Sequence, residues 1–64
     1  MCSVNGEEYT PAEGETIADL VEKITGGSPR GIAVSRDLSV VPRSQWSATP
    51  VTGQIDILTA AQGG

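Results

Sequence analysis

Apolar and polar residues alternate near the N-terminus of the chain, and this alternation predicts a β-hairpin. Cys2 and Val4 can share one face of a short strand, with Ser3 on the other. Asn5-Gly6 is the strongest two-residue hairpin signal, because both turn positions tolerate a positive φ angle. We therefore expect a second, antiparallel strand around residues 7–10, followed by a loop that contains Pro11 and Gly14.

The next segment has helical periodicity. Thr16 is a suitable N-cap, and Asp19 stands at the third helical position, as in an acidic capping box. Asp19 and Lys23 are four residues apart with the acid first, which favours an ion pair. The segment Gly26-Gly27 should end the helix. A single apolar stripe is expected to face the core and comprises Ile17, Leu20, Val21 and Ile24.

The second half of the chain again has strand character. The segment "GIAVS" (31–35) predicts a third strand, and a turn near Arg36-Asp37 leads to the short strand "SVV" (39–41). Pro42 cannot donate a backbone hydrogen bond, so this strand should end there or lie at an edge. The segment "RSQW" (43–46) is consistent with one helical turn that places Trp46 over the core.

The last strand is predicted over residues 55–60, "IDILTA". It is the most apolar strand and should lie at the centre of the sheet, beside the first. One face is expected to carry Ile55, Ile57 and Thr59, and the other Asp56, Leu58 and Ala60. One amphipathic helix and a set of alternating strands favour an α+β fold, in which the helix packs across one face of a mixed sheet of four to five strands.

Composition narrows the chemistry. The chain has 64 residues, one cysteine and no histidine, which excludes an internal disulfide, a structural zinc site and the His-dependent catalytic arrangements. A net charge of −4 argues against nucleic acid and favours partners with basic surfaces. No segment approaches the roughly 20 apolar residues needed to cross a membrane, and no signal peptide is evident, so we expect a reduced, cytoplasmic setting.

The remaining candidate side chains favour structural roles. Cys2 and Trp46 are interpreted as packing residues, because nothing in the sequence would activate the thiol or form a ligand stack. Four carboxylates near one end, those of Glu7, Glu8, Glu13 and Glu15, are interpreted as a solvated loop edge. The sequence therefore predicts a protein without catalytic residues of its own.

The C-terminal segment is the one plausible reactive site. Gln62-Gly63-Gly64 follows the last predicted strand without a linker, so we divide the chain into a domain (1–60) and a flexible tail (61–64). Glycines can enter a narrow tunnel in any backbone conformation. A terminal carboxylate is a poor electrophile, but adenylation would open it to sulfur or nitrogen nucleophiles, and no Cβ hinders attack at Gly64.

The chain resembles the sulfur carrier proteins of thiamine biosynthesis, which are small β-grasp (ubiquitin-like) domains. The resemblance covers nearly the whole chain and rests on "VNGE" (4–7), "VVPRSQW" (40–46) and "ILTAAQGG" (57–64), with the helix "TIADLVEKI" (16–24) between them. The segment "SRDLSV" (35–40) departs from the family, whose members often carry an Asn-Gly turn there.

The resemblance implies a sulfur carrier. An activating enzyme that uses ATP and magnesium would adenylate the Gly64 carboxylate, and sulfur from a donor such as a cysteine desulfurase would convert it to a thiocarboxylate. Thiazole synthase would then receive the sulfur. Gly63, with Gln62, would supply the flexibility of the tail, and no cofactor is expected to remain bound.

The residues alone leave alternatives open. A carrier for molybdopterin, cysteine or tRNA thiolation would share the fold and the Gly-Gly end. A ubiquitin-like binding module with a tail that is never activated is a second alternative. Leu58 and Ala60, which face away from the predicted core just before the tail, are the candidate residues for partner docking.

Overall fold

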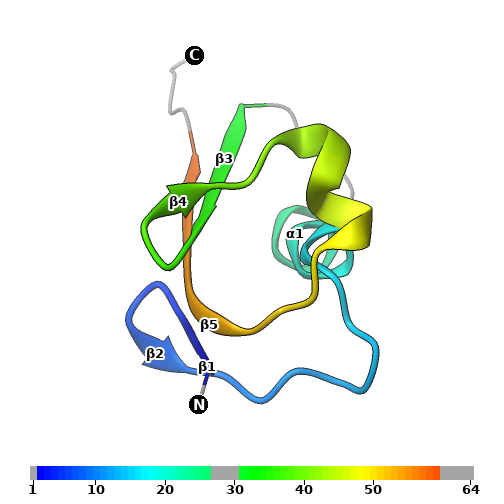
Figure 1. Ribbon diagram of the computed structural model, residues 1–64. Helices are drawn as coiled ribbons and strands as arrows, with labels where there is room; N and C mark the ends of the chain where they lie inside the picture. The colour runs from blue at the N-terminus through cyan, green and yellow to red at the C-terminus, as the bar shows by residue number, and fades with distance from the viewer. Residues whose placement is uncertain (1, 27–30, 60–64) are drawn as a thin grey trace.

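A five-stranded mixed sheet with one α-helix on one face forms the domain (Figure 1). The computed structural model describes residues 2–26 and 31–59. The strand order is β2-β1-β5-β3-β4, with β1 and β5 parallel and the other neighbours antiparallel. The elements are β1 (Cys2–Val4), β2 (Glu7–Glu8), α1 (Ile17–Thr25), β3 (Ile32–Arg36), β4 (Ser39–Val40), the 3₁₀ helix η1 (Arg43–Ala48) and β5 (Gly53–Thr59). The α+β prediction and the central position of the last strand are confirmed.

The first hairpin is tighter than the sequence predicts. Asn5 and Gly6 both have positive φ angles, 52° and 83°, as the two-residue turn requires. β2 ends at Glu8 instead of Thr10, although Tyr9 N–H still donates to the Cys2 carbonyl at 2.9 Å. The chain then leaves the sheet toward the loop that precedes α1, so the predicted residues 9 and 10 are outside the strand.

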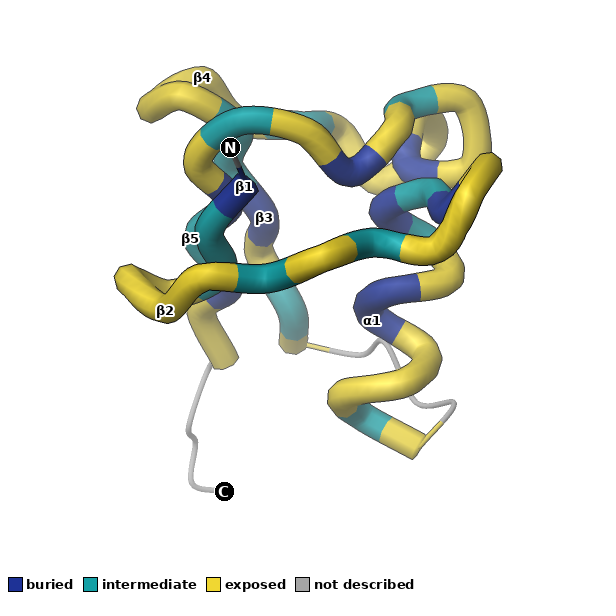
Figure 2. Tube along the Cα trace, turned by 90° about the horizontal axis from the view of Figure 1, so that it is seen from below, coloured by how far each residue is buried: buried dark blue, intermediate teal, exposed yellow. Residues whose placement is uncertain are grey.

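The helix begins as predicted. Thr16 is the N-cap, its side chain accepts from Asp19 N–H, and the Asp19 carboxylate accepts from Thr16 N–H, which completes a capping box. Gly26, with a φ of 75°, forms the C-cap. The apolar stripe is shorter than predicted. Ile24 is 50% exposed, because the last turn of α1 runs past the buried part of the helix (Figure 2).

The core lies between the sheet and α1. β5 contributes Ile55 and Ile57, and η1, which packs against α1, contributes Trp46. The indole N–H of Trp46 donates to the Val41 carbonyl at 2.9 Å, so its one polar group is satisfied. The packing roles predicted for Cys2 and Trp46 are confirmed. The buried apolar residues are Cys2, Ile17, Leu20, Val21, Val34, Trp46, Val51, Ile55 and Ile57.

The turn between β3 and β4 is fastened to the start of β5. Asp37 and Leu38 have positive φ angles, 51° and 71°, in the two turn positions. Asp37 Oδ1 accepts from the backbone N–H of Gln54 at 2.9 Å. The same carboxylate packs directly on Gly53, where an added Cβ would lie 2.7 Å from Oδ1. Gly53, with a φ of 72°, is therefore needed both for its conformation and for its lack of a side chain.

We expect Gly53→Ala to lower the free energy of unfolding by about 1–3 kcal/mol for the positive φ alone, and further because the Asp37 carboxylate must move. Gly14→Ala is the matched control, since Gly14 also has a positive φ but has open space around its Cβ position. Urea unfolding of both variants measures the difference. Equal losses would show that the contact between Asp37 and Gly53 contributes nothing.

Candidate functional site

The end of β5 exposes apolar side chains on the sheet face opposite α1. Leu58 lies opposite Ala33 of β3, and Val40 of β4 lies opposite Ser35, so these residues share the face away from the core. Leu58 is 68% exposed and Val40 is 78% exposed. We call Leu58, Ala33 and Val40 the outer patch. The predicted outward orientation of Leu58 is thus seen in the structure, whereas Ala60 lies outside the described residues.

The same face becomes polar toward the start of β5. Asp56 lies opposite Ser35 and accepts from the Gln54 side-chain amide at 3.2 Å. Leu58 and Ala33 therefore lie toward the end of the face from which the chain continues to its C-terminal residues, whereas Val40 lies beside Ser35, level with Asp56. Such an arrangement suits a docking surface with an apolar centre and a charged margin.

The residues with the predicted chemistry follow β5 directly. Gln62, Gly63 and Gly64 lie outside the described residues, and the last described residue is Thr59. Gly64 is the fifth residue after Thr59, and a fully extended chain of five residues spans at most about 17 Å. This length limits how far the Gly64 carboxylate can lie from the end of β5 when a partner is bound to the outer patch.

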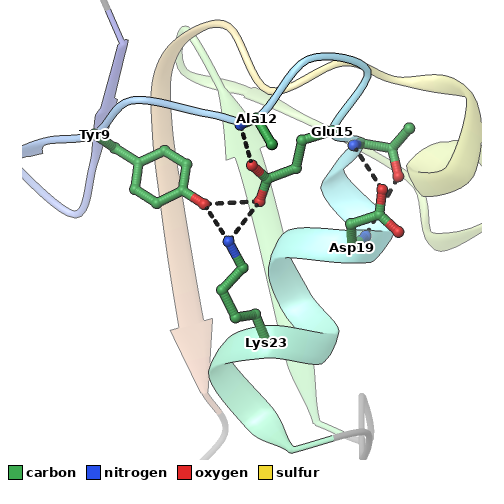
Figure 3. Close-up of polar contacts among 6 residues, drawn as sticks. Tyr9, Ala12, Glu15, Asp19 and Lys23 are labelled. Carbon is green, nitrogen blue, oxygen red and sulfur yellow. Dashed lines mark hydrogen bonds and ion pairs between the residues drawn. The ribbon is translucent and has the colours of Figure 1, made fainter.

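The acidic cluster of the sequence divides into exposed and buried members. Glu7, Glu8 and Glu13 are exposed, as a solvated edge requires, but the side chain of Glu15 is only 4% exposed. Its carboxylate accepts from the Tyr9 hydroxyl at 2.7 Å and from Ala12 N–H at 2.8 Å (Figure 3). The interpretation of Glu15 as a solvated residue is therefore wrong. Its burial depends on Tyr9, a partner six residues away that no local pattern identifies.

Lys23 also has a different partner from the one predicted. Its ammonium group lies 3.1 Å from Glu15 Oε2 and donates to the Tyr9 hydroxyl at 2.7 Å (Figure 3). The predicted pair with Asp19 does not form, because the Asp19 carboxylate is engaged in the capping box. Lys23, Tyr9 and Glu15 thus form one connected network.

This network fixes the entry to the helix. The Tyr9 hydroxyl hydrogen bond, followed by that of Ala12 N–H, lowers the pKa of Glu15 below its ordinary value of 4.5 against the opposing effect of burial. The pKa of Lys23 is raised, first by its hydrogen bond to Tyr9 and then by Glu15. Both shifts mean that the charged forms of Glu15 and Lys23 are favoured in the folded protein. This is expected of an ion pair that holds the 9–15 loop against α1, and not of groups that exchange protons with a substrate.

Other kinds of site are not seen in the described part of the chain. Residues 2–26 and 31–59 contain no group of three or more His, Cys, Asp or Glu side chains placed to hold a metal ion. Within the same residues, no helix has the length and apolar character that a membrane crossing needs.

A mixed sheet whose last strand is central and parallel to the first, with one helix across one face, defines a small β-grasp domain of the ubiquitin-like class. The chain belongs to the ThiS family, whose sequence profile matches residues 2–64. The crystal structure of the thiamine biosynthesis protein ThiS from Geobacter metallireducens superposes with a TM-score of 0.71 at 22% identity, covering 98% of this chain and 97% of that one. No curated protein sequence gives a significant match. These comparisons confirm the β-grasp fold and the resemblance to thiamine-type sulfur carriers.

We expect Glu15→Gln to lower the free energy of unfolding at pH 7 by about 1.5–3 kcal/mol, the usual contribution of hydrogen bonds to a charged group. Because the pKa of Glu15 is lower in the folded protein, its contribution is present above the unfolded value of about 4.5 and is lost as the pH falls through the folded value. The wild-type protein should therefore lose stability more steeply than the variant below about pH 5. Urea unfolding between pH 3 and 7 checks this, with Glu13→Gln as the exposed control. Parallel pH profiles for wild type and Glu15→Gln would contradict the role of the carboxylate.

Proposed function

We propose that the protein carries sulfur for formation of the thiazole ring of thiamine, with Gly64 as the residue that is modified. The observation that carries this proposal is the match to the ThiS family over residues 2–64, which extends through the Gln62-Gly63-Gly64 segment. In this proposal an adenylating enzyme activates the Gly64 carboxylate, and thiazole synthase accepts the sulfur. The protein acts as a co-substrate of these enzymes.

The proposed chemistry has two steps, the first at a carboxylate oxygen of Gly64 and the second at the carbonyl carbon of the same group. A Gly64 carboxylate oxygen attacks the α-phosphorus of ATP, and pyrophosphate leaves, so that the carbonyl carbon is held in a mixed anhydride with AMP. A sulfur nucleophile at the oxidation level of sulfide then attacks this carbon, the bond to AMP breaks, and a thiocarboxylate remains. ATP and magnesium belong to the adenylating enzyme. A donor such as a cysteine desulfurase supplies the sulfur as a persulfide, and a thiol reductant brings it to the level of sulfide with release of a disulfide.

The division into a domain (1–60) and a tail (61–64) fits this chemistry. Gly63 and Gly64 have no side chains, so the carboxylate can enter an enzyme active site through a narrow opening. Gln62 precedes them and completes the tail. The folded domain supplies the surface by which a partner recognises the carrier, because the tail itself offers few distinguishing groups.

We propose further that the outer patch docks on the adenylating enzyme. Leu58 and Val40 are large, apolar and exposed on one face, and Leu58 is the second-to-last residue of β5. Ala60, which follows Thr59 in the sequence, is included in this proposal. The acidic character of the protein, with Asp56 beside the patch, would steer it toward a basic partner surface.

The carrier role is tested by the intact mass of the protein after incubation with ATP, magnesium, sulfide and the adenylating enzyme of the same organism. We expect a mass gain equal to the exchange of one oxygen for one sulfur, located in the peptide that contains Gly64. A variant with one alanine added after Gly64 should gain nothing. An unchanged wild-type mass, with an enzyme shown to be active on another carrier, would contradict the proposal.

The docking surface is tested by Leu58→Asp. A charge at the centre of an apolar contact is costly to desolvate, so we expect kcat/KM for adenylation to fall by roughly 10- to 100-fold, equivalent to about 1.4–2.7 kcal/mol. The melting temperature should change little, because Leu58 is exposed. Ile24→Asp, at the half-exposed end of α1, is matched in charge and should leave kcat/KM near the wild-type value. Equal effects of the two substitutions would remove the outer patch as the docking surface.

A further inference from the structure

The backbone groups of β5 alternate between its two neighbours. In the ladder with β3, the backbone N–H and C=O groups of the even-numbered β5 residues point toward β3. The hydrogen bond from Asp37 N–H to the Gln54 carbonyl shows this orientation. The backbone N–H and C=O groups of the odd-numbered β5 residues point toward the other neighbour, β1. The Ile55 carbonyl accepts from Asn5 N–H at 2.8 Å on that side.

The pairing on the β1 side ends halfway along β5. The parallel register joins Val4 to Ile55 and goes no further. One more contact follows, from Ile57 N–H to the side-chain oxygen of Asn5 at 2.7 Å. After that the hairpin turns away, and Figure 1 shows β5 continuing beyond it. Among the described residues, no strand faces the Ile57 carbonyl or the Thr59 N–H. We call this segment, residues 57–59, the open edge.

The open edge lacks the features that protect the outer edges of this sheet. The outer strand β2 has two residues, both glutamates, and β4 has two residues followed closely by Pro42. Short, charged or proline-flanked strands discourage pairing with other chains. The open edge instead carries Leu58 and Thr59, which are uncharged, and both residues are exposed. It therefore offers a donor, an acceptor and an apolar side chain to an incoming strand.

We propose that the open edge binds an extended segment of the adenylating enzyme as an added β-strand. This inference rests on the proposed carrier function. Such a strand would pair with the Thr59 N–H and the Ile57 carbonyl, and its apolar side chains could contact Leu58 on the outer face. It would also fix the direction in which the chain leaves β5, five residues before Gly64. A second copy of this chain is a poorer occupant, because it would bring another net charge of −4 to a short edge.

Amide hydrogen exchange, followed by NMR, tests the pairing directly. In the free protein, Thr59 N–H should exchange rapidly and Leu58 N–H slowly, because Leu58 pairs with Ala33. Addition of the adenylating enzyme without ATP should slow the exchange of Thr59 at least tenfold. Glu8 N–H, which points away from β1 on the far edge of the sheet, should not change. Unchanged exchange at Thr59 in a saturated complex would overturn the proposal. Slowing that depends on carrier concentration without enzyme would also overturn it, because it would identify a second copy as the occupant.

Thr59→Pro tests the functional consequence. Proline removes the N–H of the open edge, and the ladder to β3 does not use that group. We expect kcat/KM for adenylation to fall about tenfold or more, which corresponds to about 1.4 kcal/mol. Glu8→Pro places a proline at the other free edge and should keep a near wild-type rate.

The outcomes separate this inference from the carrier proposal. If wild-type protein is adenylated and Thr59→Pro, shown by its melting temperature to be folded, is adenylated equally well, the added strand is wrong and the carrier role stands. If wild-type protein is not adenylated at all by an active enzyme, the carrier role itself fails. In that case the hydrogen-exchange measurement still reports whether Thr59 N–H is protected in the complex.

Discussion

The pairing of β5 on both of its edges holds the two halves of the domain together. β1 and β3 do not pair with each other, so the N-terminal hairpin and the β3–β4 hairpin meet only across the central strand. Asn5 reinforces this arrangement: its backbone forms the hairpin turn, and its side chain accepts from Ile57 N–H, 52 residues away in the sequence. One residue therefore closes a local turn and fixes a long-range register.

The sheet and the helix each depend on the other to bury their apolar faces, because a chain of 64 residues can bury little surface. Ile17 and Ile55 are fully buried on opposite sides of the same interface. The long connection through η1 closes the remaining side with Trp46. At the start of α1, Ile17 N–H donates to the Thr49 carbonyl and Val51 N–H donates to the Glu15 carbonyl, so the loop before α1 is joined to the segment after η1. The buried Glu15 carboxylate belongs to this junction, and its hydrogen bonds offset the cost of its burial.

Features determined by neighbouring residues could be predicted from the sequence. The Asn5-Gly6 turn, the Thr16 cap and the Gly26 stop each depend on the conformational preferences of a few residues. Features determined by distant partners could not. The exposure of Ile24 depends on how far the helix extends beyond the sheet. The ion pair of Lys23 with Glu15, in place of Asp19, depends on the position of Tyr9, which lies in a different segment.

The same distinction applies to the candidate site. The outward orientation of Leu58 follows from the alternation of a strand, and the sequence predicts it. The neighbouring Val40 could not be added to the surface before the register of β3 and β4 was known. The open edge was equally hidden, since it exists only because β1 stops at Val4 while β5 continues to Thr59.

The proposed division into a domain and a tail has a consequence for the selectivity of a partner enzyme. A glycine carboxylate presents no side chain, so an enzyme that reads only the tail could not distinguish this carrier from another protein that ends in the same residues. Discrimination must therefore come from the folded surface near the tail. The outer patch and the open edge share Leu58, near the end of β5, and the first offers apolar area while the second offers directed backbone hydrogen bonds. In the proposed function, a partner that uses both would recognise the fold and orient the tail in a single binding event, because the strand that it pairs with is continuous in sequence with Gly64, the residue proposed to be modified.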